Sequence, residues 1–203
     1  MTESDDKWWS SVEEALSAGE RIGHTSEQFN LACEHITQLL SDSSTLLSAG
    51  SHATATFLAI TALEETVKVH LGMYRRSATS LKRSKDPLYK HKEKHALALG
   101  PTVAMGSRLQ KAIGESRMYE LIEKGRSGEL VRLREVSLYV EQHGTDLKAP
   151  RAVVSASIAR EILLLAIEVF DDALVGYTNR SFQLGEITDA LFKQWARNLD
   201  PKK

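Results

Sequence analysis

Apolar residues recur at helical spacing along almost the whole chain. Between Ser51 and Tyr74 they occupy most of the circumference of a helical wheel, which is typical of a buried helix. The preceding segment, which begins at Ser26 and carries a one-sided apolar face, is followed by Gly50 at the position of a C-cap residue. Because Ser26 and Ser51 are good N-cap residues, the two segments predict an antiparallel helical hairpin with a very short turn.

Shorter periodic segments predict the remaining elements. We expect further helices over residues 7–18, 90–99, 102–124, 130–140, 151–177 and 181–198. Polar or glycine-rich stretches predict loops over residues 77–87, 125–128 and 141–150. No stretch alternates apolar and polar residues with the period of two that half-buried strands show. The pattern therefore predicts an all-α bundle of five or six helices.

The length of 203 residues fits one domain. We predict a single all-α domain over residues 1–203, made of an N-terminal helical extension over 1–25, a core over 26–177, and a C-terminal helix and tail over 178–203. Hydrophobic residues make up 42% of the chain and charged residues 26%, which is ordinary for a globular protein. The formal net charge of −1 gives no global attraction to nucleic acid or to a membrane.

The single cysteine and the N-terminus bear on the compartment. Cys33 is the only cysteine, so an intramolecular disulfide is impossible. It lies on an apolar helical face, and we therefore expect a core residue rather than a nucleophile. The first ten residues, MTESDDKWWS, are acidic and lack the basic and apolar regions of a signal peptide. The longest apolar run, residues 162–167, is too short to span a bilayer. These features predict a cytoplasmic protein with no membrane segment.

Charged side chains on the buried helix are the first candidates for function. Glu64, Glu65 and Lys68 gather in one arc of that helix, because residues three or four apart share a helical face. Burial of two carboxylates and an ammonium group is costly unless they pair or face a wet cleft. One interpretation is a solvated ion pair, which stabilises a helix by about 0.2–0.5 kcal/mol. The other is a carboxylate that acts as an acid or base in a cleft.

Two histidines lie four residues apart in the segment HKEKH. His91 and His95 share a helical face, as metal-binding pairs do, but Glu93 stands one position too late for a zincin motif. Such a pair is more often a surface feature of a basic helix, so we expect no metal. A metal site would require Glu64 and Glu65 to lie close to the two rings.

Basic residues concentrate between Arg75 and Lys94. We predict that Arg75, Arg76, Lys90 and Lys92 contact nucleic acid, in a salt-dependent manner. The alternative is a solvated loop and helix face, and few aromatic residues are interleaved to stack on bases.

The segment RLREVSLY adds an arginine and a tyrosine. Arg134 is suited to hold a phosphate or an oxyanion, whereas Tyr139 can donate a hydrogen bond but is a poor base with a free pKa of about 10. The alternative is a helix end at which Arg134 caps a neighbour and Tyr139 packs half-buried. The sequence contains no phosphate-binding glycine loop, no serine-nucleophile elbow, no CxxC pair and no dinucleotide fingerprint.

Three segments, in this order, carry a resemblance to a known family. They read LLSDSSTLLSAGSHATATFLAITALEETVK, YKHKEKHALAL, and LREVSLYVEQHG followed by Pro150 and a long apolar helix. This arrangement resembles the AbiV-type abortive-infection proteins of bacteria, within the HEPN superfamily (higher eukaryotes and prokaryotes nucleotide-binding). The resemblance covers roughly residues 29–174. It implies a HEPN-like helical bundle that defends bacteria against phage by acting on RNA or translation in the infected cell.

The resemblance also bears on catalysis. Many HEPN proteins are metal-independent ribonucleases built as dimers. Their motif is an arginine, often followed by a polar residue, and a histidine that four to six intervening residues separate from the arginine. Arg134 and Glu135 match the beginning of this motif, but Tyr139 stands where its shortest version places the histidine, and His143 follows too late. The motif is therefore degenerate, and whether the protein is an enzyme stays open.

These observations combine into one predicted groove. Its catalytic residues are expected to be Glu64, Glu65, Lys68, His91, Arg134 and Tyr139, with Lys92 beside them and no metal or cofactor. His91 is the best available base. The resemblance implies a homodimer, with RNA and a phage protein activator as expected partners.

Two alternatives belong to other classes of function. The first is a non-catalytic protein-binding module that recognises a phage or ribosomal component. The second is a metal-dependent helical enzyme that uses His91, His95 and the glutamates.

Overall fold

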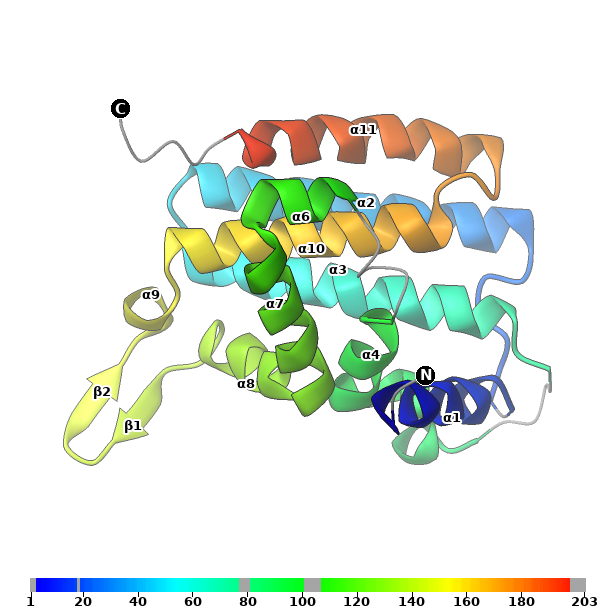
Figure 1. Ribbon diagram of the computed structural model, residues 1–203, viewed down its shortest axis with the longest axis horizontal. Helices are drawn as coiled ribbons and strands as arrows, with labels where there is room; N and C mark the ends of the chain where they lie inside the picture. Colours follow the sequence, from blue (N-terminus) through cyan, green and yellow to red (C-terminus); the bar gives the residue numbers. More distant parts are fainter. Residues whose placement is uncertain (1–2, 18, 77–80, 101–106, 198–203) are drawn as a thin grey trace.

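The computed structural model of the protein describes residues 3–17, 19–76, 81–100 and 107–197. Within these residues the chain forms ten α-helices, two short 3-10 helices and a single two-stranded hairpin. The predicted all-α fold is confirmed, but with more helices than the five or six expected. Four long helices lie side by side as the body of the bundle (Figure 1). They are α2 (Ser26–Ser48), α3 (His52–Met73), α10 (Ala156–Leu174) and α11 (Asn179–Ala196).

The centre of the bundle is formed by α3 and α10. Both helices are buried on almost every side, as the apolar pattern over residues 51–74 predicts for α3. A helix of this kind needs neighbours all round it. α2 and α10 pack on α3, and α11 packs on α2 and α10. The buried position of α3 matters because this helix carries the candidate carboxylate.

The predicted hairpin of α2 and α3 is present. The capping at the start of each helix differs from the one expected. Thr25, not Ser26, is the N-cap of α2, and its hydroxyl accepts a hydrogen bond from the backbone N–H of Gln28 at 3.2 Å. Gly50 follows the helix with a φ of +79°, as a residue in the left-handed region after a C-terminus. Ser51 occupies the N-cap of α3, but its side chain forms no capping hydrogen bond.

Short helices cover one side of the long ones (Figure 1). α1 (Glu3–Ser17) packs on α3 and on α4 (His91–Ala98). The helix expected over residues 102–124 is divided at Gly114, whose φ is +86°, and its first residues, 102–106, lie outside the described part. The two pieces are α6 (Ser107–Ile113) and α7 (Glu115–Ser127).

The expected flexible loop over residues 125–128 is wrong. α7 continues to Ser127, and α8 (Glu129–Val136) begins after Gly128. The glycine at position 125 permits a close helix contact, because a Cβ there would lie 2.0 Å from Leu99 Cδ1. The glycine therefore serves packing at this position, not flexibility.

Residues 141–150 contain a small hairpin that the sequence does not predict. β1 (Glu141–His143) pairs antiparallel with β2 (Asp146–Lys148) around Gly144, whose φ is +61°. The strands are three residues long and largely exposed, so no alternating pattern marks them. The hairpin projects from the bundle beside α8 (Figure 1).

The long helix expected over residues 151–177 is two helices. α9 (Pro150–Val153) ends before Ser155, which is the N-cap of α10 and accepts a hydrogen bond from the N–H of Ile158 at 3.3 Å. α11 then begins with a capping box formed by Thr178 and Ser181. The expected tail after residue 197 lies outside the described part.

Segments at the two ends of the chain pack against the core helices. α1 contacts α3 and α4, and α11 contacts α2 and α10. The division at residues 25 and 177 stays a prediction. In the described ranges, none of the helices combines the length and apolarity needed to cross a membrane.

Candidate functional site

Glu64 places a buried carboxylate at the junction of α3, α4 and α8. Its side chain is only 3% exposed, yet four basic groups surround it. His91 Nδ1 lies 2.8 Å from each carboxylate oxygen, Lys94 Nζ lies 2.8 Å from Oε2, and His95 Nε2 lies 2.8 Å from Oε1. Arg134 Nε is 3.5 Å from Oε1. We call Glu64, His91, Lys94, His95 and Arg134 the Glu64 cluster.

The spacing of residues on α4 explains why three side chains reach one carboxylate. His91, Lys94 and His95 stand at positions i, i+3 and i+4, which share one face of a helix. α4 packs directly on α3, and Leu97 and Ala98 on α4 are buried in the core. The core packing of α4 therefore holds the basic face of the helix against Glu64.

The carboxyl group of Glu64 is held in its ionised form. Burial by itself raises the pKa of this group, but the hydrogen bond from His95 and the charge of Lys94 outweigh it and lower the pKa to about 2. An ionised carboxylate only accepts hydrogen bonds, so both imidazole rings present an N–H to it. In its neutral form His91 therefore carries its lone pair on Nε2, the nitrogen away from Glu64.

His91 differs from the other basic groups of the cluster in its exposure. Its side chain is 44% exposed, whereas that of Lys94 is 7% exposed and that of His95 is fully buried. A carboxylate that fixes one ring nitrogen of a histidine selects the tautomer and orients the ring. His91 is thus an oriented imidazole with one side open to solvent.

Arg134 completes the cluster from α8. Its guanidinium carbon lies 4.7 Å from the centre of the Phe57 ring, a cation–π distance. Its Nε is buried and has no hydrogen-bond partner among the described residues, because 3.5 Å to Glu64 Oε1 is too long for a good bond. The side chain is 20% exposed. Lys94 and Arg134 supply two cationic side chains against the one carboxylate of Glu64.

Three predicted groove residues do not join the cluster. Glu65 pairs with Lys68, and Lys68 Nζ lies 5.9 Å from the centre of the Tyr89 ring. Successive residues of a helix point about 100° apart, so Glu64 and Glu65 face different neighbours. Tyr139 lies beyond the end of α8, is 60% exposed and forms no hydrogen bond to the cluster. The structure therefore does not bring Glu65, Lys68 and Tyr139 into the Glu64 cluster, and their catalytic role stays a prediction.

Arg75 is not available as a nucleic-acid contact in this structure. Its side chain is fully buried and pairs with Asp86 through both ends of the guanidinium group. It also donates to the backbone oxygens of Ala15 and Glu20, at 3.0 and 3.1 Å. Gly19 permits this approach, since a Cβ there would lie 2.1 Å from Arg75 Nη1. The basic run includes a structural arginine that sequence alone does not distinguish.

The other three predicted contacts are exposed. Arg76 pairs with Glu13 at 3.3 Å on the surface, and Lys90 and Lys92 lie on either side of His91 in the sequence with exposed side chains. Their role toward nucleic acid stays a prediction.

Lys94 and Phe57 belong to no site predicted from the sequence, and His95 belongs only to the alternative metal site with His91 and the glutamates. A signal for each exists in the spacing. His95 and Lys94 follow His91 by four and three residues, and Phe57 precedes Glu64 by two helical turns. The missing information was that α4 and α8 converge on the same turn of α3.

Two further candidates from the sequence are a metal site and the cysteine. Across the described residues, no group of three or more His, Cys, Asp or Glu side chains has an arrangement that could hold a metal ion. His91 and His95 direct their nitrogens at Glu64 itself. Cys33 is buried, and burial raises the pKa of its thiol to about 12, in agreement with the expected core position.

The fold and the cluster define an all-α protein with a positively charged, partly open Glu–His site. The family model described as AbiV, in the HEPN superfamily, matches residues 24–171. The chain therefore belongs to the AbiV-type HEPN family, a family of abortive-infection defence. No curated protein and no solved structure matches the chain.

Proposed function

We propose that this protein is an antiphage effector that cleaves RNA without a metal, with His91 as the general base. The observation that carries the proposal is the contact of His91 Nδ1 with the buried Glu64 carboxylate at 2.8 Å, on a ring that is 44% exposed. The HEPN motif histidine is absent at position 139. His91, from a different helix, supplies an imidazole in its place.

The proposed chemistry is transfer of the RNA phosphate to its own 2′ oxygen. His91 Nε2 takes the proton of the 2′-hydroxyl, the 2′ oxygen bonds to the adjacent phosphorus, and the bond to the 5′ oxygen breaks. Water protonates the leaving oxygen. Glu64 stays ionised and stabilises the imidazolium that forms, as a carboxylate does in other carboxylate–histidine pairs.

The phosphate requires positive charge as its oxygens gain charge in the transition state. Arg134 is the partly exposed cation of the cluster, with 20% of its side chain exposed, whereas Lys94 is buried. Lys92, next to His91 in the sequence and exposed, and Lys68 are further candidates. These residues support recognition of a phosphate by charge, without readout of base sequence.

The decisive experiment uses purified protein and total cellular RNA in the presence of a chelator. The wild-type protein is expected to cleave, and His91→Ala is expected to lower the rate by about 10²–10⁴-fold, the usual contribution of a general base. His35→Ala is the matched control, because His35 is an exposed histidine on α2 away from the cluster. Its rate should equal that of the wild type.

Two results would contradict the proposal. Equal cleavage by wild type and His91→Ala would remove His91 as the base. Intact RNA together with arrested translation would favour the non-catalytic alternative, in which the protein binds a phage or ribosomal component.

The proposal includes the cellular setting that the family suggests. We expect a homodimer in the bacterial cytoplasm that is activated by a phage protein. Sedimentation of the purified protein with and without phage lysate reports both self-association and the activating partner.

A further inference from the structure

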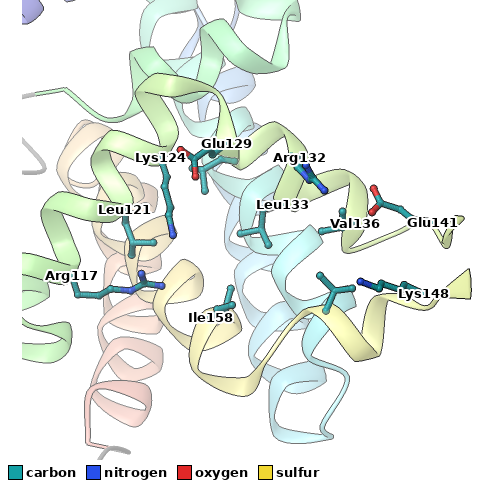
Figure 2. Close-up of a pocket in the computed structure, with 12 residues that line it drawn as sticks. Arg117, Leu121, Lys124, Glu129, Arg132, Leu133, Val136, Glu141, Lys148 and Ile158 are labelled. Carbon is teal, nitrogen blue, oxygen red and sulfur yellow. The ribbon is translucent and has the colours of Figure 1, made fainter. Parts of the chain in front are cut away.

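A concave site lies beside α8, apart from the Glu64 cluster. It is a cavity of about 330 Å³ whose walls come from α7, α8, the β1–β2 hairpin, α9 and α10 (Figure 2). None of the five cluster residues lines it. Its volume lies at the lower end of the range of about 300–1,000 Å³ that is typical of small-molecule sites.

The walls of the cavity are aliphatic. Leu121, Leu130 and Val136 are buried core residues, and the rest of the apolar lining is partly exposed. The apolar lining consists of Leu121, Leu130, Leu133, Val136, Val153 and Ile158. No aromatic side chain is among the described residues that line the cavity, so it offers no surface on which a nucleobase would stack. The walls favour an aliphatic ligand.

Cationic side chains surround these walls. Figure 2 shows Lys124 and Lys148 on opposite sides of Leu133, with Arg132 on the upper edge. Arg117, Lys124, Arg132 and Lys148 line the cavity, against the carboxylates of Glu129 and Glu141. Cations therefore outnumber carboxylates around an apolar surface.

Two of these cations are available for a ligand. Arg117 pairs with Glu120 and Glu161, and Lys124 pairs with Glu120. Arg132 and Lys148 are exposed and form no ion pair with any residue that the structure describes. Arg132 comes from α8 and Lys148 from β2 (Figure 2).

We propose that this cavity binds an amphipathic anion: an aliphatic chain against the leucine, valine and isoleucine side chains, with a carboxylate or phosphate head between Arg132 and Lys148. Removal of each methylene group of such a chain from water favours binding, and the two cations select the charge of the head group. This site does not depend on the proposed ribonuclease activity.

Calorimetric titration of the full chain tests the proposal with three eight-carbon probes. Octanoate and octyl phosphate are expected to bind with one site per chain, and octylammonium about tenfold more weakly or worse. The tighter of the two anions identifies the head group. Absence of binding by both anions, or equal binding of octylammonium, would overturn the proposal.

A pair of surface variants tests the location. Lys148→Gln is expected to weaken binding of the tighter anion about fivefold, as the loss of a partly exposed ion pair does. Arg151→Gln is the matched control, because Arg151 is an exposed cation on α9 that does not line the cavity. Equal weakening in both variants would reveal non-specific attraction and overturn the assignment.

Methyl NMR of the wild-type protein gives a second readout that does not require a variant to fold. The anion should shift the methyl signals of Leu133, Val136, Val153 and Ile158. Shifts confined to another part of the bundle would place the ligand elsewhere and contradict the proposal.

Discussion

The Glu64 cluster and a second charged cluster, around Arg108, have central groups of opposite charge. In the first, one buried carboxylate is surrounded by basic groups. In the second, Arg108 of α6 is surrounded by Glu168 and Asp171 of α10 and Asp189 of α11. We call these four residues the Arg108 cluster. Both lie between three helices, so both connect segments that are distant in the sequence.

The two clusters differ in whether every nitrogen of the exposed basic side chain binds another member of the cluster. Arg108 directs Nε, Nη1 and Nη2 at three carboxylates, with Nη1 at 2.6 Å from Asp189 Oδ1, and its guanidinium stacks 4.2 Å from the centre of the Phe192 ring. In the Glu64 cluster, the exposed ring of His91 keeps Nε2 away from the carboxylate. A buried charge network therefore becomes a candidate for chemistry when one titratable member keeps a nitrogen or oxygen that no other member of the network binds.

The carboxyl groups of the two clusters also have pKa values that shift in opposite directions. The pKa of Glu64 is lowered to about 2 because its hydrogen bonds and Lys94 outweigh burial. Burial raises the pKa values of Glu168 and Asp171, and Arg108 offsets only part of that rise. Burial lowers the pKa of Arg108, but its hydrogen bonds to Glu168 and Asp171 outweigh it and raise the pKa.

The largest expected effect is that of removing the central carboxylate. Glu64→Ala leaves Lys94 and His95 buried without their counter-charge and should lower the free energy of unfolding by about 3–5 kcal/mol. Urea unfolding at neutral pH measures it. A loss below about 1 kcal/mol, the size expected for an exposed pair, would show that Glu64 is not the centre of a buried network.

The pH dependence of stability tests the same carboxylate without truncating it. A group whose pKa falls from 4.5 to about 2 on folding contributes stability above pH 4.5 that is lost as the pH falls toward 2. The stability difference between wild type and Glu64→Gln should therefore shrink by up to about 3 kcal/mol over this range. Urea unfolding of both proteins from pH 6 to pH 3 follows its onset, and a constant difference would contradict the lowered pKa.

Removal of the cation from the Arg108 cluster should have a smaller effect. Arg108 is 33% exposed, so Arg108→Met is expected to destabilise by about 2 kcal/mol at neutral pH, less than a fully buried pair. The carboxyl pKa values of Glu168 and Asp171 then rise further. Because a raised carboxyl pKa makes stability fall as the pH rises, the penalty should diminish between pH 7 and pH 5.

The same variant sharpens the contrast in function. Arg108→Met should cleave RNA at the wild-type rate per folded molecule, because no member of its cluster contacts the Glu64 cluster. Loss of cleavage in a folded Arg108→Met protein would show that the second cluster is more than a structural link.

The smallest effect is expected for the neighbouring ion pair on α3. Lys68→Ala should change the free energy of unfolding by less than about 1 kcal/mol, because the pair with Glu65 is partly exposed. Urea unfolding beside Glu64→Ala gives the comparison within one helix. If Lys68→Ala lowered the free energy of unfolding as much as Glu64→Ala does, the pair of Lys68 with Glu65 would be as important for stability as the Glu64 cluster.

Helical periodicity predicted the major elements well because it depends on local spacing. The buried character of α3 follows from its apolar residues, and the hairpin with α2 follows from Gly50. Ends and breaks were less accurate. Thr25 rather than Ser26 caps α2, and the N-cap Ser155 divides the expected last core helix from α9.

The site was predicted in part. Glu64, His91 and Arg134 were proposed from three separate segments, and the structure brings them together. Glu65, Lys68 and Tyr139 were grouped with them, but Glu65 and Lys68 pair with each other and Tyr139 lies beyond the end of α8. Arg75 looked like one more cation of a basic run, yet it is buried on Asp86.

The sequence by itself determined the all-α class, the buried character of α3 and the types of side chain available for chemistry. These properties depend on residue type and on the spacing of apolar residues within one segment. Only the tertiary structure decided which of two adjacent glutamates meets α4 and α8, which histidine keeps an open nitrogen, and where an aliphatic cavity forms beside α8. Those properties depend on how helices pack across long separations in the chain, and a pattern along one segment contains no information about the segment that will face it.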